Sequence, residues 1–264
     1  MKSQKSVYFG SNMKMYHGIE ETAAYLKELE KITSDLNRSG IRIFLMPPAP
    51  ALPAAKAAVS PDTHILLGAQ NVSWLDKGAL TGEISTGILK ELDISLVLIG
   101  HSERREHFSE TSEMENRKIV HALSEGFSVV YAVGETAADR DYSTGDEALR
   151  QQLKIGLHNI PSHYADRITI MYEPVWAIGE KGLPATPEYA DERHLAIRRC
   201  LTELFQETGE QIPVLYGGSA NADNAPGFIV QPHIDGVCAT RGAWPAGNFD
   251  RMIRECLTAL NSNT

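Results

Sequence analysis

Three side chains that can carry acid–base and electrostatic chemistry follow closely after short apolar segments of the chain. They are Lys14 after residues 7–9, His101 after residues 96–99 and Glu173 after residues 168–172. A carboxylate can take a proton from carbon, an imidazole can donate a hydrogen bond to a carbonyl oxygen, and an ammonium can stabilise an oxyanion. Together these types would suit proton transfer next to a carbonyl group.

Each of the three residues also has a simpler interpretation. Lys14 could be an ordinary surface lysine, and His101 a structural histidine with its hydrogen bonds satisfied. The neighbours of His101 favour a functional role, because Gly100 permits a tight turn and Ser102 suits the cap of a following helix. The positive end of that helix dipole would keep the imidazole neutral.

The segment after Glu173 reads EPVWAIGEKG over residues 173–182. Its apolar residues would be unfavourable in a loop that is merely solvated. A lid that closes over a ligand and excludes water explains them better. The alternative is that Glu173 is a structural acid paired with a nearby basic residue.

Two glycine-containing turns lie near the C-terminal end of the chain. The first reads YGGS over residues 216–219, and the second reads ATRGAW over residues 239–244. Backbone N–H groups of such a turn can hold a phosphate, with the Ser219 hydroxyl assisting. The first turn alone is weak support for a phosphate site.

The elements that must position these residues alternate between strands and helices. Apolar segments predict eight strands, at residues 7–9, 41–46, 65–67, 96–99, 128–133, 168–172, 214–216 and 236–239. Helical patterns cover residues 20–37, 113–125, 147–158 and 187–208, the last with Pro187 at its start and Thr186 as a candidate cap.

This alternation predicts an α/β fold with a parallel sheet. Eight repeats favour an eight-stranded parallel (β/α)8 barrel formed by residues 1–264 as a single domain. A doubly wound open sheet also fits the alternation, but no GxGxxG turn follows the first strand. In a barrel, the loops at the C-terminal ends of the strands carry the chemistry.

The composition argues against several classes of partner. The net charge of −9 does not suit a broad nucleic-acid interface. The three cysteines, Cys200, Cys238 and Cys256, show no spacing typical of a disulfide framework or a zinc site. Neither a signal peptide nor a membrane-spanning segment is apparent. We therefore expect a cytoplasmic protein with no nucleic-acid or membrane partner.

Four motifs together resemble the triosephosphate isomerase family. They are GALTGEIS at 78–85, GHSERR at 100–105, YEPVWAIG at 172–179 and YGGS at 216–219, in the order typical of that family. The resemblance implies a TIM barrel, no cofactor and no metal, and a glycolytic and gluconeogenic isomerase of small phosphorylated sugars. It also implies a homodimer in which the loop Thr81-Gly82-Glu83 reaches the partner beside Lys14.

The resemblance assigns roles to individual positions. It implies that Glu173 is the base, His101 the electrophile and Lys14 the cation that stabilises the enediolate, with Asn12 beside it. The substrate-binding residues that it implies are Glu103, which orients the lysine, together with Gly179, Ser219, Thr240, Arg241 and Gly242.

Several positions depart from the family pattern. Met13 replaces a tryptophan, Ala132 replaces a cysteine, and the lid is one residue longer after Gly179. Thr240-Arg241 stands where the family has two glycines, so a guanidinium could contribute to phosphate binding. We expect an isomerase of triose phosphates. The alternatives are a related isomerase of a tetrulose phosphate such as erythrulose phosphate, and a barrel that binds a sugar phosphate without catalysis.

Overall fold

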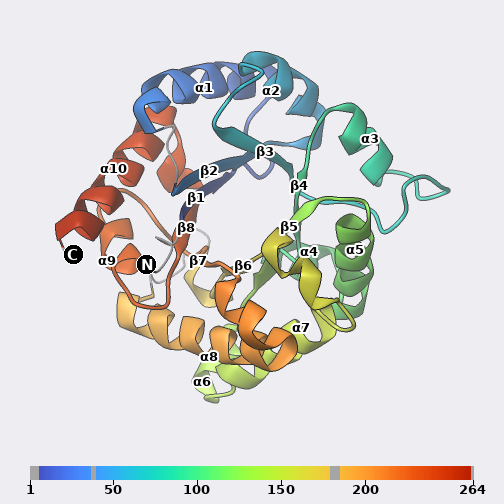
Figure 1. Cartoon of the computed structure of the whole chain (residues 1–264), viewed down its shortest axis with the longest axis vertical. Coiled ribbons are helices and arrows are strands. Elements are labelled where there is room, and N and C mark those ends of the chain that lie inside the picture. The colour runs from blue at the N-terminus through green and yellow to red at the C-terminus, as the bar shows by residue number, and fades with distance from the viewer. Residues whose placement is uncertain (1–5, 37–39, 179–184, 263–264) are drawn as a thin grey trace.

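The computed structural model describes residues 6–36, 40–178 and 185–262. Eight strands form a closed barrel in which every strand pairs in parallel with its neighbours in sequence and β8 pairs with β1 (Figure 1). The strands are β1 (Val7–Asn12), β2 (Ile41–Met46), β3 (Ile65–Ala69), β4 (Leu96–Ile99), β5 (Ser128–Val133), β6 (Ile168–Tyr172), β7 (Val214–Tyr216) and β8 (Gly236–Ala239). This topology confirms the predicted (β/α)8 barrel.

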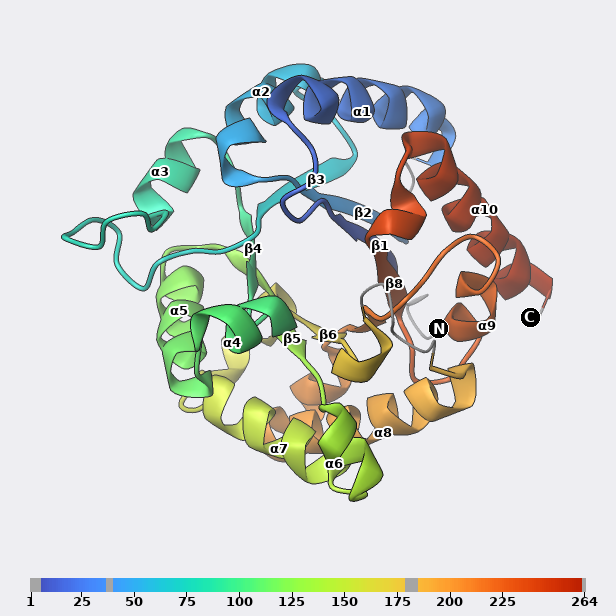
Figure 2. The same ribbon diagram turned by 180° about the vertical axis from the view of Figure 1, so that it is seen from behind.

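Helices surround the strands on the outside of the barrel (Figures 1 and 2). They are α1 (Ile19–Ile32), α2 (Leu52–Ala58), α3 (Thr86–Glu91), α4 (Ser102–Phe108), α5 (Ser112–Ser124), α6 (Ala137–Asp141), α7 (Gly145–Gly156), α8 (Pro187–Phe205), α9 (Ala225–Ile229) and α10 (Ala246–Ser262). Among the described residues, no helix is long and apolar enough to span a membrane.

Six of the eight strands have the predicted bounds, and β1 and β3 are longer. The first strand continues through Asn12, which pairs with Met46 on β2. The third continues through Ala69, which pairs with Val97 on β4. Short polar residues and glycines have low intrinsic strand propensity, but pairing with neighbouring strands outweighs that preference.

All four predicted helices end earlier than expected, α5 and α7 by one or two residues and α1 and α8 by more. The first ends at Ile32 and is followed by a short 3₁₀ helix at Ser34–Leu36, while Asn37 lies outside the described residues. The helix that begins at Pro187 ends at Phe205, because Gln206 adopts a positive φ of 55° that ends the helix. Its predicted cap is confirmed, since the Thr186 side chain accepts a hydrogen bond from the Tyr189 N–H.

Apolar side chains form two separate clusters. A large cluster lies between the strands and the surrounding helices. A smaller one fills the barrel interior and consists of Phe44, Met46, Leu96, Leu98, Val130, Ala132, Met171, Leu215 and Cys238, with Tyr8 packed against it. Because side chains alternate along each strand, the polar residues that end the strands stand above this interior cluster.

Candidate active site

The residues singled out in the first, fourth and sixth loops lie at one end of the barrel. Asn12 ends β1, His101 follows β4 after one glycine, and Glu173 follows β6 directly. Figure 2 looks onto this end of the barrel, with α4 toward the viewer. Asn12, His101 and Glu173 are all at least 95% buried. The structure therefore brings the predicted site residues of these loops together.

His101 and Glu173 are in direct contact. The Nε2 atom of His101 lies 3.2 Å from Oε1 of Glu173. The Nδ1 atom of the same ring accepts a hydrogen bond from the Glu103 N–H at 3.3 Å. When the ring is neutral and accepts at Nδ1 it can donate only through Nε2, so its neutral form here is the Nε2–H tautomer.

The same contact corrects the predicted cap of α4. His101 occupies the cap position, and Ser102 is the first residue of the helix. The Ser102 N–H lies 3.4 Å from Oε2 of Glu173, so the carboxylate contacts the first turn of the helix. Because the imidazole and the carboxylate meet the first N–H groups of α4, the serine hydroxyl is not needed as the cap.

Burial and pairing shift the pKa values of this pair. Burial alone lowers the pKa of His101, but the adjacent Glu173 carboxylate outweighs it, and the net shift is upward. Burial raises the pKa of Glu173, whereas His101 and Lys14 lower it, and the net shift is downward. The helix dipole alone predicts the opposite direction for His101, because it takes no account of a carboxylate in contact with the ring.

Lys14 is held beside this pair by contacts with β1, with α4 and with the loop after β3. Its Nζ atom lies 2.6 Å from Oε1 of Glu103, and its backbone N–H donates to the Asn12 side chain at 2.9 Å. The Lys14 carbonyl oxygen accepts a hydrogen bond of 2.8 Å from Gln70, which also binds the Met46 carbonyl at 2.9 Å. Lys14 has a positive φ of 48°, a strained conformation that these contacts maintain.

The described part of the seventh and eighth loops lines one cavity with these residues. This cavity of about 130 Å³ is lined by Lys14, Tyr16, Glu103, Glu173, Ile178, Gly217, Gly218, Ser219, Ala220, Thr240, Arg241 and Gly242. Every predicted substrate-binding residue is in this set except Gly179, which lies outside the described residues. A cation, a carboxylate and two glycine-containing turns around one space can bind an anion beside a base.

A larger cavity of about 760 Å³ lies at the opposite end of the barrel. Its lining includes Arg42, Leu66 and Thr169, which come from the N-terminal halves of their strands. It contains none of the residues that the motifs single out. The chemistry of the lining therefore locates the candidate site better than cavity size does.

Glu135, which lies just after β5 and is fully buried, belongs to none of the motifs singled out in the sequence. Its Oε1 atom accepts hydrogen bonds from Tyr172 at 2.8 Å, Trp176 at 2.8 Å and Tyr189 at 3.1 Å. Trp176 belongs to the segment after Glu173, so Glu135 anchors the start of that segment. Its position directly after a strand was the only available signal.

The loop between β3 and α3 extends away from the barrel (Figures 1 and 2). It carries Thr81, Gly82 and Glu83, which are all exposed. Oε2 of Glu83 accepts a weak hydrogen bond of 3.4 Å from Asn71 at the base of the loop.

Among the described residues, no group of three or more His, Cys, Asp or Glu side chains could hold a metal ion.

Comparison with known proteins gives matches along nearly the whole chain. Residues 7–256 match a family described as triosephosphate isomerase. The chain is 37% identical to the L-erythrulose-1-phosphate isomerase of Rhizobium rhizogenes, with 100% of each chain covered. It is 35% identical to the protein of that name from Mycolicibacterium smegmatis, over 94% of this chain and 92% of the relative. It is 39% identical to the triosephosphate isomerase of Geobacter metallireducens, over 92% and 95% respectively.

Proposed function

The chain belongs to the triosephosphate isomerase family, and from this premise we propose that it isomerises a tetrulose phosphate by proton transfer between neighbouring carbons. The observation that carries the proposal is the contact of 3.2 Å between His101 and Glu173, with Lys14 lining the same cavity as the carboxylate. These are a base, a hydrogen-bond donor and a cation, which proton abstraction beside a carbonyl requires.

In the proposed reaction, Glu173 takes a proton from the carbinol carbon next to the carbonyl. The His101 Nε2–H donates a hydrogen bond to the carbonyl oxygen, and Lys14 stabilises the negative charge of the enediolate. Glu173 then returns the proton to the other carbon. His101 gives its Nε2 proton to the former carbonyl oxygen and takes the hydroxyl proton of the first carbon, so the carbonyl has moved by one position. The substrate and product have the same overall oxidation state, so the reaction needs no external oxidant, reductant or cofactor.

The names of the relatives favour a four-carbon substrate over the triose phosphate that the sequence analysis placed first. Of the three relatives compared above, two are named L-erythrulose-1-phosphate isomerase and one is named triosephosphate isomerase. Erythrulose 1-phosphate is dihydroxyacetone phosphate with one hydrogen of its free carbinol carbon replaced by a hydroxymethyl group. The same base and donor can therefore act on both compounds.

The position of the phosphate decides which carbon can react. In erythrulose 1-phosphate, C1 is esterified, so the free carbinol next to the C2 carbonyl is C3. Proton loss from C3 and return to C2 moves the carbonyl to C3. Renumbered from the other end, the product is erythrulose 4-phosphate, so the proposed reaction interconverts two ketoses.

The eighth loop supplies the proposed phosphate contact. Thr240, Arg241 and Gly242 line the cavity with Ser219 and Lys14. A guanidinium binds phosphate through charge-assisted hydrogen bonds. We assign Arg241 and Ser219 to the phosphate and leave the carbonyl end of the substrate to His101 and Lys14.

The proposed test compares two substrates and two enzymes. L-Erythrulose 1-phosphate and dihydroxyacetone phosphate are each incubated with wild type and Glu173→Gln in D₂O, and ¹H NMR follows product formation and deuterium incorporation. We expect wild type to turn over the tetrulose phosphate with the higher kcat/KM, and Glu173→Gln to lose about 10²–10⁴ of kcat. Equal turnover by both enzymes would exclude Glu173 as the base, and preference for the triose would exclude the proposed substrate.

We also propose a homodimer formed through the projecting loop at Thr81-Gly82-Glu83. The support is the exposure of these residues in a loop that leaves the barrel. Sedimentation equilibrium of wild type and of a variant with this loop shortened tests the proposal. A wild-type monomer at micromolar concentration would exclude it.

A further inference from the structure

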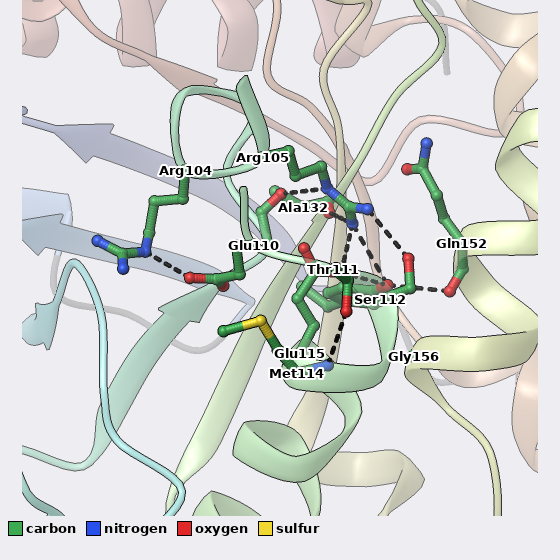
Figure 3. Close-up of polar contacts among 12 residues, drawn as sticks. Arg104, Arg105, Glu110, Thr111, Ser112, Met114, Glu115, Ala132, Gln152 and Gly156 are labelled. Carbon is green, nitrogen blue, oxygen red and sulfur yellow. Dashed lines mark hydrogen bonds and ion pairs between the residues drawn. The ribbon is translucent and has the colours of Figure 1, made fainter. Parts of the chain in front are cut away.

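Arg105 lies directly behind the turn that carries His101. Its Nε donates to the Gly100 carbonyl oxygen at 2.9 Å. Its Nη2 donates to the Ala132 carbonyl oxygen at 3.1 Å (Figure 3). Its Nη1 donates to the Ser112 hydroxyl at 3.1 Å. One guanidinium therefore connects the end of β4 to the end of β5 and to the start of α5. Gly100 immediately precedes His101, so this connection fixes the backbone from which the imidazole projects.

Glu115 and Tyr131 hold the guanidinium in this position. Oε2 of Glu115, a fully buried carboxylate on α5, lies 2.7 Å from Nη2 of Arg105. The Tyr131 hydroxyl lies 3.1 Å from the same carboxylate oxygen and 2.9 Å from the Gln152 carbonyl oxygen. It also accepts from Arg105 Nη2 at 3.4 Å. The arginine, the acid and the phenol therefore form one buried network from three elements.

We propose that Glu115 and Tyr131 are positioning residues, which hold Arg105 against the Gly100 carbonyl and so fix the turn that presents His101. The expected effect on kcat rests on the proposed isomerase function. The expected effect on the turn does not. Neither residue lines the cavity, so both would act through Arg105. The Arg105 side chain is 21% exposed, which gives the guanidinium a route toward solvent when its partner is lost.

The charge of Glu115 makes this arrangement sensitive to pH. Burial raises the pKa of Glu115 to about 7, and Glu110 adds to the rise, whereas Arg105, Lys118 and the Tyr131 hydroxyl lower it. Oε1 of Glu115 has no hydrogen-bond partner among the described residues, which is consistent with incomplete stabilisation of the anion. Protonation of Glu115 removes the charge that pairs with Arg105, so the His101 turn should be best fixed above neutral pH.

The test uses Glu115→Gln and Tyr131→Phe, with Glu113→Gln as a matched control. Glu113 is an exposed acid on the same helix. We expect Glu115→Gln to lower kcat about 10-fold at pH 8 with KM within about twofold, because a misplaced His101 affects the reaction more than binding. In wild type we expect kcat to fall below neutral pH as Glu115 becomes protonated, and this fall should be absent in Glu115→Gln. Tyr131→Phe should move that fall to higher pH, since the hydroxyl lowers the pKa of Glu115.

A second measurement is independent of activity. Amide hydrogen exchange of the peptide that contains Gly100 and His101 should be about 10-fold faster in Glu115→Gln than in wild type, with exchange in β2 unchanged. The inference would be overturned if Glu115→Gln and Tyr131→Phe had the same kcat–pH profile as wild type and if Gly100 and His101 exchanged at the wild-type rate in Glu115→Gln. Changed exchange in a protein without isomerase activity would support the positioning role and reject only the proposed function.

Discussion

The Nε2 atom of His101 lies 3.2 Å from Oε1 of Glu173, and both side chains are at least 95% buried. This distance is that of a direct hydrogen bond and leaves no space for a substrate carbon between the two groups. A base and a donor acting on one substrate must each approach a different atom at about 3–3.5 Å. Substrate binding therefore has to separate the carboxylate from the imidazole.

The pairing of His101 with Glu173 predicts a defined pH window of stabilisation. The pKa of His101 is raised above 6.5, so its contribution is complete below pH 6.5 and is lost as pH rises through the higher folded value. The pKa of Glu173 is lowered below 4.5, so its contribution is complete above pH 4.5 and is lost as pH falls through the lower folded value. The pair should stabilise the fold most between pH 4.5 and pH 6.5.

Glu173→Gln tests this window without removing the side-chain volume. We expect the variant to lower the pKa of His101, measured by NMR titration of the imidazole. The difference in the free energy of unfolding between wild type and variant should be largest inside the window and should shrink on both sides. An unchanged His101 pKa in Glu173→Gln would contradict the assigned cause of the shift.

The contact between Lys14 and Glu103 predicts unequal effects of the two side chains. Lys14→Met removes the proposed oxyanion partner and should lower kcat by about 10²–10³-fold. Glu103→Gln keeps the lysine but weakens the contact of 2.6 Å that orients it, so the loss should be nearer tenfold. Steady-state kinetics measures both, with the exposed Lys27→Met on α1 as control. A greater loss of kcat in Glu103→Gln than in Lys14→Met would contradict the assignment of Lys14 as the oxyanion partner and Glu103 as the residue that orients it.

Arg241 should affect binding more than the reaction. We expect Arg241→Gln to raise KM for the phosphorylated substrate and the inhibition constant of inorganic phosphate by about tenfold or more, because a charge-assisted hydrogen bond to phosphate is lost. The value of kcat should change little, since the contact is the same in the ground state and the transition state. A fall in kcat with unchanged KM would place Arg241 at the reacting carbons instead.

The sequence predicted the barrel and the loops that bring His101 and Glu173 together, because both depend on local signals. Each strand is a short apolar segment, and His101 and Glu173 follow their strands almost immediately, so the topology alone brings them to one end. The partners that hold these residues come from distant segments. Trp176 meets Glu135 across 41 residues and Lys14 meets Glu103 across 89, and no local pattern contains such pairings.

The electrostatics of the site was also beyond the sequence. The helix dipole predicted a lowered pKa for His101, but the direction depends on where the Glu173 carboxylate lies in three dimensions. The cap of α4 was assigned to Ser102 by residue preference, whereas the imidazole in contact with that carboxylate occupies the position. Both errors have one cause, which is a tertiary contact that outweighs a local preference.

Glu115 should make the stability of the protein depend on pH in the opposite direction to an acid whose folded pKa is lowered, such as Glu173. Its folded pKa of about 7 is raised from 4.5, so its contribution is complete below pH 4.5 and is lost as pH rises to about 7. The free energy of unfolding of wild type relative to Glu115→Gln should fall by up to about 3 kcal/mol across this range and then stay constant. Chemical denaturation at several pH values measures it. If this difference in the free energy of unfolding did not change with pH, the pKa of Glu115 would not be raised in the folded protein.

Gly156 on α7 and Tyr131 on β5 fit together closely. A Cβ atom added at Gly156 would lie 2.2 Å from the Tyr131 hydroxyl oxygen and 2.4 Å from its Cζ. The ring is fully buried and its hydroxyl is tied to Glu115, so the ring cannot move aside without breaking the network behind His101. Only glycine therefore fits opposite a tyrosine at this position.

A double-mutant cycle tests this complementarity. Gly156→Ala should destabilise the fold by about 1–3 kcal/mol through overpacking, and Tyr131→Leu by a similar amount through lost contacts. The double variant should lose less than the sum, with a coupling of about 0.5–3 kcal/mol, because leucine has no atom where the added methyl group must sit. Gly247→Ala on α10 is the control, since a Cβ there meets nothing within 4 Å and should stabilise the helix by about 0.5–1 kcal/mol. Additive losses would mean that α7 shifts to accept the methyl group, and the network around Arg105 would then tolerate more movement than the distances imply.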